Sequence, residues 1–88
     1  MKLIVNWQNA TRLPDERIKI ERAYKERLLG LCEDDIEMCQ KLHDDHYRQH
    51  QRPDTEWSKY NMIAAQEATQ TLMPSERRDA CFSVRFEK

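Results

Sequence analysis

Apolar and polar residues alternate near both ends of the chain, a period of two that is typical of β-strands. Two segments show it, residues 2–7 and residues 81–87. Their positions on the predicted inner side are Leu3, Val5, Trp7, Phe82, Val84 and Phe86. A two-stranded ribbon is only marginally stable alone. We therefore expect the two strands to pair and to be covered by helices on one face.

Between these segments the apolar residues recur at helical spacing. The first predicted helix runs from about Pro14 to Leu29, because proline suits a first helical turn, where its missing N–H costs nothing. Its inner face holds Ile20, Tyr24, Leu28 and Leu31. Ile18 and Leu29 lie nearly opposite, which suggests either contact with the sheet or a partly exposed apolar spot.

A break is predicted near residues 30–33. Gly30 is the only glycine and could adopt the left-handed conformation that ends many helices. Asp34 followed by Glu37 resembles a capping box, which indicates a new helix from about Asp35. The alternative is one continuous helix over residues 14–51, with Gly30 tolerated at a cost of about 1 kcal/mol.

The second helix is expected to end near Gln51, because Pro53 disfavours a helical conformation for the residue before it. At about 100° per residue it has two unlike faces. The inner stripe would contain all three histidines of the chain: Ile36, Cys39, His43, His46, Tyr47 and His50. The opposite face would be charged: Asp34, Glu37, Lys41, Asp44, Asp45 and Arg48.

The third helix is predicted to begin after a cap at Asp54 or Thr55 and to end at Pro74. Its buried stripe is predicted to be Trp57, Tyr60, Ala64, Ala68, Thr71 and Leu72. Residues 75–78 could add one capped turn. The whole pattern predicts a single α+β domain over residues 1–88, in the order β-α-α-α-β, with three helices packed on one short antiparallel ribbon.

Charge is unevenly distributed although the net charge is only −1. Residues 33–48 hold six acidic residues against Lys41 and Arg48, a net of −4. Residues 11–31 have a small basic excess that is interleaved with acids. The chain contains three cysteines, no signal-peptide pattern and no long apolar run. We expect reduced thiols, a cytoplasmic location and no contact with membrane.

Candidate chemistry is sparse. Cys39, His43, His46 and His50 could offer pairs of metal donors at helical spacing, but about 16 Å of helix axis separates the first from the last. No CxxC or HExxH motif, nucleophile elbow or phosphate-binding loop is present. The histidines could instead act together as a pH-sensitive seam. We expect no catalytic activity and no cofactor, and metal binding is kept as an alternative.

A second alternative is nucleic-acid binding through the basic residues of the first helix, with Arg12, Arg77, Arg78 and Arg85 as additions. The acids at every turn of that helix argue against it, because such domains are normally strongly basic.

The sequence favours a small interaction protein, namely a regulator, adaptor or inhibitor of another macromolecule. Its general character, a compact single domain without a catalytic motif, fits an accessory protein of bacterial or phage type. The predicted partner is a protein that meets the charged face of the second helix, at Asp34, Glu37, Lys41, Asp44, Asp45 and Arg48. A homodimer formed through the histidine stripe is a further hypothesis.

Overall fold

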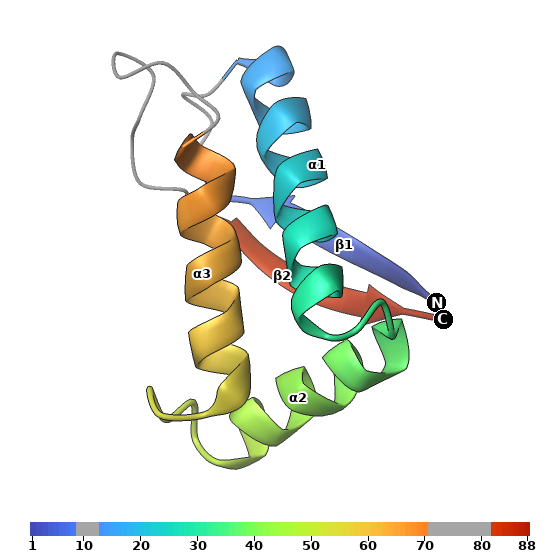
Figure 1. The fold of residues 1–88 in the computed structure, drawn as a ribbon, viewed down its shortest axis with the longest axis vertical. Helices are drawn as coiled ribbons and strands as arrows, with labels where there is room; N and C mark the ends of the chain where they lie inside the picture. The colour runs from blue at the N-terminus through green and yellow to red at the C-terminus, as the bar shows by residue number, and fades with distance from the viewer. Residues whose placement is uncertain (9–12, 71–81) are drawn as a thin grey trace.

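The computed structural model describes residues 1–8, 13–70 and 82–88. Three helices pack on a two-stranded antiparallel sheet in the order β-α-α-α-β, which confirms the predicted fold class. Helices α1 and α3 run side by side in opposite directions, and α2 crosses the end of this pair (Figure 1). No helix in the described part of the chain is both long enough and apolar enough to span a membrane.

The sheet is formed by the two ends of the chain, which lie next to each other (Figure 1). Strand β1 spans Lys2–Trp7 and strand β2 spans Phe82–Glu87. Their register places Val5 opposite Val84. Side chains alternate along a strand, so this register puts every predicted inner residue on one face. All six belong to the core or pack against it: Leu3, Val5, Trp7, Phe82, Val84 and Phe86.

Helix α1 spans Pro14–Leu31 and has proline in its first turn, as predicted. Ile20, Tyr24 and Leu28 are fully buried along one face, at the spacing expected for an amphipathic helix. Three of the four predicted inner residues are thus confirmed, but Leu31 is only half-buried and is not part of the core cluster. Of the two residues predicted on the opposite side, Ile18 is exposed, whereas Leu29 packs against the core.

The end of α1 differs from the prediction, because Gly30 is part of the helix and not its left-handed cap. The left-handed residues are Glu33, with φ 57°, and Asp34, with φ 60°. The N–H of Asp34 donates to the carbonyl of Leu29 at 2.7 Å and that of Glu33 to Gly30 at 3.2 Å, the paired bonds of a Schellman motif. The longer helix keeps Cys32, its C-cap residue, fully buried.

The predicted break before the second helix is confirmed, and α2 spans Ile36–Arg48. Its cap is Asp35 and not Asp34. A carboxylate oxygen of Asp35 accepts from the N–H of Glu37 at 3.0 Å and from that of Met38 at 3.3 Å. This bonding satisfies two of the free N–H groups at the start of the helix.

Helix α2 ends at Arg48, three residues before the predicted end. His50 and Gln51 both have φ 58°, and the N–H of Gln51 donates to the carbonyl of His46 at 2.9 Å. A second Schellman motif thus ends the helix before Pro53 can affect it. His50 consequently lies outside the helix and outside the predicted stripe.

Helix α3 spans Glu56–Gln70, and Thr55 caps it by accepting from the N–H of Ser58 at 3.2 Å. Of its predicted stripe, Trp57, Ala64 and Ala68 are buried and Tyr60 is half-buried. The predicted residues Thr71, Leu72, Pro74, Arg77, Arg78 and Cys81 lie outside the described residues, as does the turn over 75–78.

The buried residues form one cluster between the ribbon and the helices. Its members in the described part of the chain are Leu3, Ile20, Tyr24, Leu28, Cys32, Cys39, Trp57, Ala64 and Ala68. The small Ala64 and Ala68 side chains allow α1 to approach α3 closely. The Tyr24 hydroxyl donates to the side-chain oxygen of Asn61, which joins the two helices through a partly buried hydrogen bond.

Candidate functional site

The inner side of α2 packs against the rest of the molecule. Cys39 is fully buried, and Ile36 and Leu42 pack against the core cluster. Leu42 is not part of the inner stripe predicted from the sequence, which runs through the histidines. Leu42 lies three residues after Cys39, so helical spacing could have identified it.

The outer face of α2 is the set predicted to meet a partner: Asp34, Glu37, Lys41, Asp44, Asp45 and Arg48. All six residues are exposed. Asp34 lies in the turn before the helix, and the other five lie on the helix itself. The structure thus places these residues together along the solvent side of α2 and of the turn that precedes it.

Some side chains of this outer face have a local partner and others do not. Arg48 pairs with Asp45, one turn away on the same helix. Asp44 lies 3.3 Å from the Nδ1 atom of His43. Among the described residues, the side chains of Glu37 and Lys41 make no ion pair or hydrogen bond. Exposed ion pairs contribute little to the free energy of folding, so both the paired and the unpaired side chains can form ion pairs with another protein surface.

The two described cysteines are structural. Cys32 and Cys39 are free thiols, both fully buried. Burial raises the pKa of the Cys32 thiol, and it raises the pKa of Cys39 further, with the hydrogen bond between the two thiols as a second cause. The Cys39 thiol also donates to the carbonyl of Leu28 at 3.9 Å. Because the thiolate is the reactive form, neither residue is poised as a nucleophile.

The three histidines occupy three different environments. His43 points into the core, His46 is hydrogen-bonded to the Thr55 hydroxyl at 2.7 Å, and His50 is exposed beyond the end of α2. The proposed donors Cys39, His43, His46 and His50 therefore do not share one centre. No group of three or more His, Cys, Asp or Glu side chains in residues 1–8, 13–70 and 82–88 could hold a metal ion.

His43 is enclosed by aromatic rings. Its ring centroid lies 4.7 Å from that of Tyr47, 4.9 Å from that of Trp57 and 5.3 Å from that of Phe86. Its side chain is only 15% exposed. The Nε2 atom is buried and has no hydrogen-bond partner within the described part of the chain. An unsatisfied buried nitrogen destabilises the fold, while the ring itself contributes packing.

Replacing His43 with phenylalanine should therefore raise the free energy of unfolding by about 1 kcal/mol, because the ring contacts are kept and the unsatisfied nitrogen is removed. Urea denaturation followed by tryptophan fluorescence measures the change. His46→Phe is the matched control: it deprives Thr55 of a partner and should lower stability. A His43→Phe protein that unfolds at lower urea than the wild type would contradict this interpretation.

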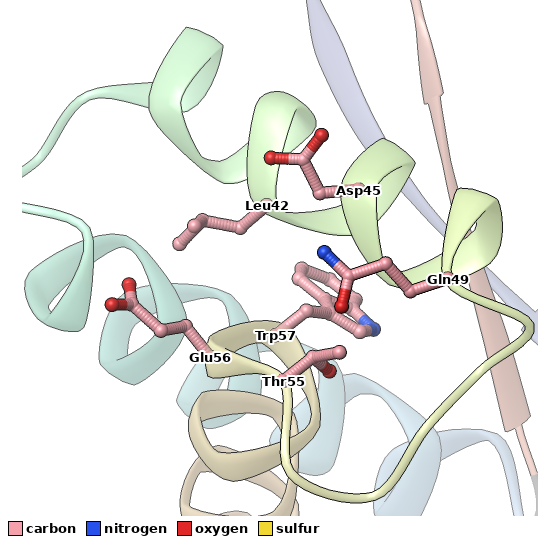
Figure 2. Close-up of a pocket in the computed structure, with 6 residues that line it drawn as sticks. All are labelled: Leu42, Asp45, Gln49, Thr55, Glu56 and Trp57. Carbon is pink, nitrogen blue, oxygen red and sulfur yellow. The ribbon is translucent and has the colours of Figure 1, made fainter.

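A small cleft of about 240 Å³ lies between the second half of α2 and the start of α3. Figure 2 shows the Trp57 indole between the two helices, with the Gln49 side chain beside it. The lining residues are Leu42, Asp45, Gln49, Thr55, Glu56 and Trp57. Asp45 also belongs to the outer face, so the cleft borders that face.

This cleft was not predicted from the sequence, because its two walls come from different helices. The available signal was the short connection between Gln49 and Thr55, since helices joined by a short loop are neighbours in space. The helical wheel of α2 alone could not show that Leu42 and Asp45 face the beginning of α3.

The basic residues proposed for nucleic-acid binding are partly neutralised where the structure describes them. The Arg27 guanidinium lies 2.6 Å from a carboxylate oxygen of Glu67, and that of Arg85 lies 2.8 Å from Glu87. Arg12, Arg77 and Arg78 lie outside the described residues. The nucleic-acid hypothesis stays a prediction.

No protein-family model, curated protein or solved structure matches the chain.

Proposed function

We propose that this protein is a small non-catalytic interaction protein, a regulator, adaptor or inhibitor, that binds a basic surface of another protein through the outer face of α2. One observation carries the proposal. All six residues of that face are exposed, and five of them lie on a helix whose opposite side is fixed in the core by Cys39 and Leu42.

Electrostatics supports a basic partner. The segment over residues 33–48 has a net charge of −4 in a chain whose net charge is −1. A concentration of one sign of charge on a rigid element raises the association rate with an oppositely charged surface, and it disfavours acidic partners. Asp35 is engaged as the helix cap, whereas the carboxylates of Glu37 and Asp44 are exposed on the helix and accessible to a partner.

Tyr47 provides an apolar contact beside these charges. It is 49% exposed and follows Asp44 by three residues, so it borders the outer face on the helix surface. Partly exposed tyrosines are frequent anchors of protein interfaces, because the ring adds contact area at a small cost in conformational entropy. The charges of the outer face would raise the association rate, and contact with the Tyr47 ring would stabilise the complex.

Two narrower hypotheses stay predictions. A homodimer through the predicted histidine stripe would have to use Tyr47 and His50, because Cys39 and His43 already pack inside their own chain. A cytoplasmic location is supported by Cys32 and Cys39, which are free thiols as expected in a reducing compartment.

The proposal is tested by affinity capture from the native host with three immobilised proteins. The double variant Glu37→Lys/Asp44→Lys should lose the partner that the wild type retains, because attraction at the outer face becomes repulsion. The matched control is Asp15→Lys/Glu26→Lys, which also reverses one first-turn acid and one exposed mid-helix acid, but on α1. Circular dichroism checks that all three proteins are folded.

Equal capture by the wild type and Glu37→Lys/Asp44→Lys would contradict the proposal. Binding to random duplex or single-stranded nucleic acid, with an affinity that falls steeply as salt rises, would favour the nucleic-acid alternative instead.

A further inference from the structure

We propose that the cleft between α2 and α3 holds one lysine or arginine side chain of the partner. This inference rests on the proposed function and specifies the partner's chemistry. The cleft adjoins the outer face through Asp45, so a protein lying along that face can extend a side chain into it.

The size of the cleft indicates a single side chain. Its volume of about 240 Å³ is below the roughly 300–1,000 Å³ of typical small-molecule sites. Leu42 and Trp57 form its apolar part (Figure 2). The methylene groups of a lysine or arginine can lie against these two residues while the charged end stays at the mouth.

The charges around the cleft select a cation. Asp45 and Glu56 supply carboxylates from the two helices, and Figure 2 shows both turned outward from the indole. None of the six lining residues is basic. An anionic side chain would be repelled here. An uncharged one would cover the carboxylates without compensating them, which is unfavourable.

The cation would pair with Asp45 and displace the current partner of that carboxylate. Arg48 holds Asp45 in an exposed pair, and its own side chain is 74% exposed. Exchange of one surface pair for another is energetically inexpensive. Glu56 strengthens the negative potential from the opposite wall, and the side-chain carbonyl of Gln49 offers a further acceptor.

The test is an NMR titration of the full chain with the peptide acetyl-Gly-Gly-Lys-Gly-Gly-amide. The lysine peptide should shift the indole N–H signal of Trp57 saturably, with millimolar affinity. The indole N–H of Trp7, which donates to Glu21, is an internal reference that should stay fixed. The same peptide with norleucine in place of lysine keeps the aliphatic stem without the charge, and it should cause no saturable shift.

Gln49 gives a matched pair of variants at one exposed position. Gln49→Lys should weaken peptide binding at least about fivefold, because like charges then meet at the mouth, and Gln49→Glu should strengthen it. The inference is overturned if lysine and norleucine peptides bind equally, if Trp57 does not respond, or if the two variants behave alike.

The capture experiment separates this inference from the proposed function. If the Trp57 signal does not shift and Glu37→Lys/Asp44→Lys no longer captures the partner, the cleft does not bind a cationic side chain. The proposed function is then unaffected. Saturable lysine binding, together with undiminished capture by that double variant, overturns the proposed function and the role of the cleft as a partner subsite.

Discussion

Replacing Leu28 with alanine is expected to lower the free energy of unfolding by about 2–5 kcal/mol. Leu28 is fully buried on the inner face of α1, and its carbonyl accepts hydrogen bonds from the Cys32 N–H and the Cys39 thiol at the corner between α1 and α2. A chain of 88 residues has a total stability of only roughly 4–13 kcal/mol. The variant should therefore be partly or wholly unfolded at moderate temperature.

Thermal and urea denaturation by circular dichroism measure this loss. Ile18→Ala is the matched control, because Ile18 lies on the same helix but is 54% exposed. Its effect should stay within about 0.5 kcal/mol. If Leu28→Ala and Ile18→Ala had similar effects, α1 would not bury the face assigned to it here.

Stability is also expected to fall steeply as pH rises above about 9, the ordinary pKa of the thiols. Burial raises the pKa values of Cys32, Cys39 and Tyr24 in the folded state. Above pH 9 the unfolded chain releases the thiol protons, and above pH 10 that of Tyr24, whereas the folded chain releases each of them only at a higher pH. The unfolded state then binds fewer protons, so each group lowers stability by up to about 1.4 kcal/mol per pH unit.

Urea midpoints at pH 7, 9 and 10.5 test this pH dependence. The double variant Cys32→Ala/Cys39→Ala should be less stable at pH 7, because it loses buried volume, and its midpoint should vary less between pH 9 and 10.5. Tyr24→Phe removes the third group, together with its hydrogen bond to Asn61. A wild-type midpoint that stays constant or rises between pH 9 and 10.5 would contradict the protonated, buried state of these residues.

The strands and helices could be predicted because local patterns specify them. The alternation of Leu3, Val5 and Trp7 indicates a strand, and Pro14 indicates the start of a helix, without reference to distant parts of the chain. The helix ends were predicted less well. Glu33 and His50 adopt left-handed conformations that usually favour glycine, so their residue types do not mark the ends of α1 and α2.

The candidate site was predictable on its solvent side alone. Charged residues such as Glu37 and Asp44 rarely tolerate burial, so their exposure follows from their chemistry. The histidine stripe was different: half-buried His46 lies within α2, but the turn that follows the helix places exposed His50 outside the helical period. The cleft at Trp57 depends on how α3 returns against α2, which is a tertiary property.

The most direct test of the role of α2 is the affinity of the purified, captured partner for three proteins measured side by side at physiological salt. The wild type and Asp15→Lys/Glu26→Lys should bind with the same dissociation constant. Glu37→Lys/Asp44→Lys should bind at least about tenfold more weakly, since like charges would then face each other across the interface. An unchanged dissociation constant for Glu37→Lys/Asp44→Lys would contradict the assignment of the outer face as the partner surface.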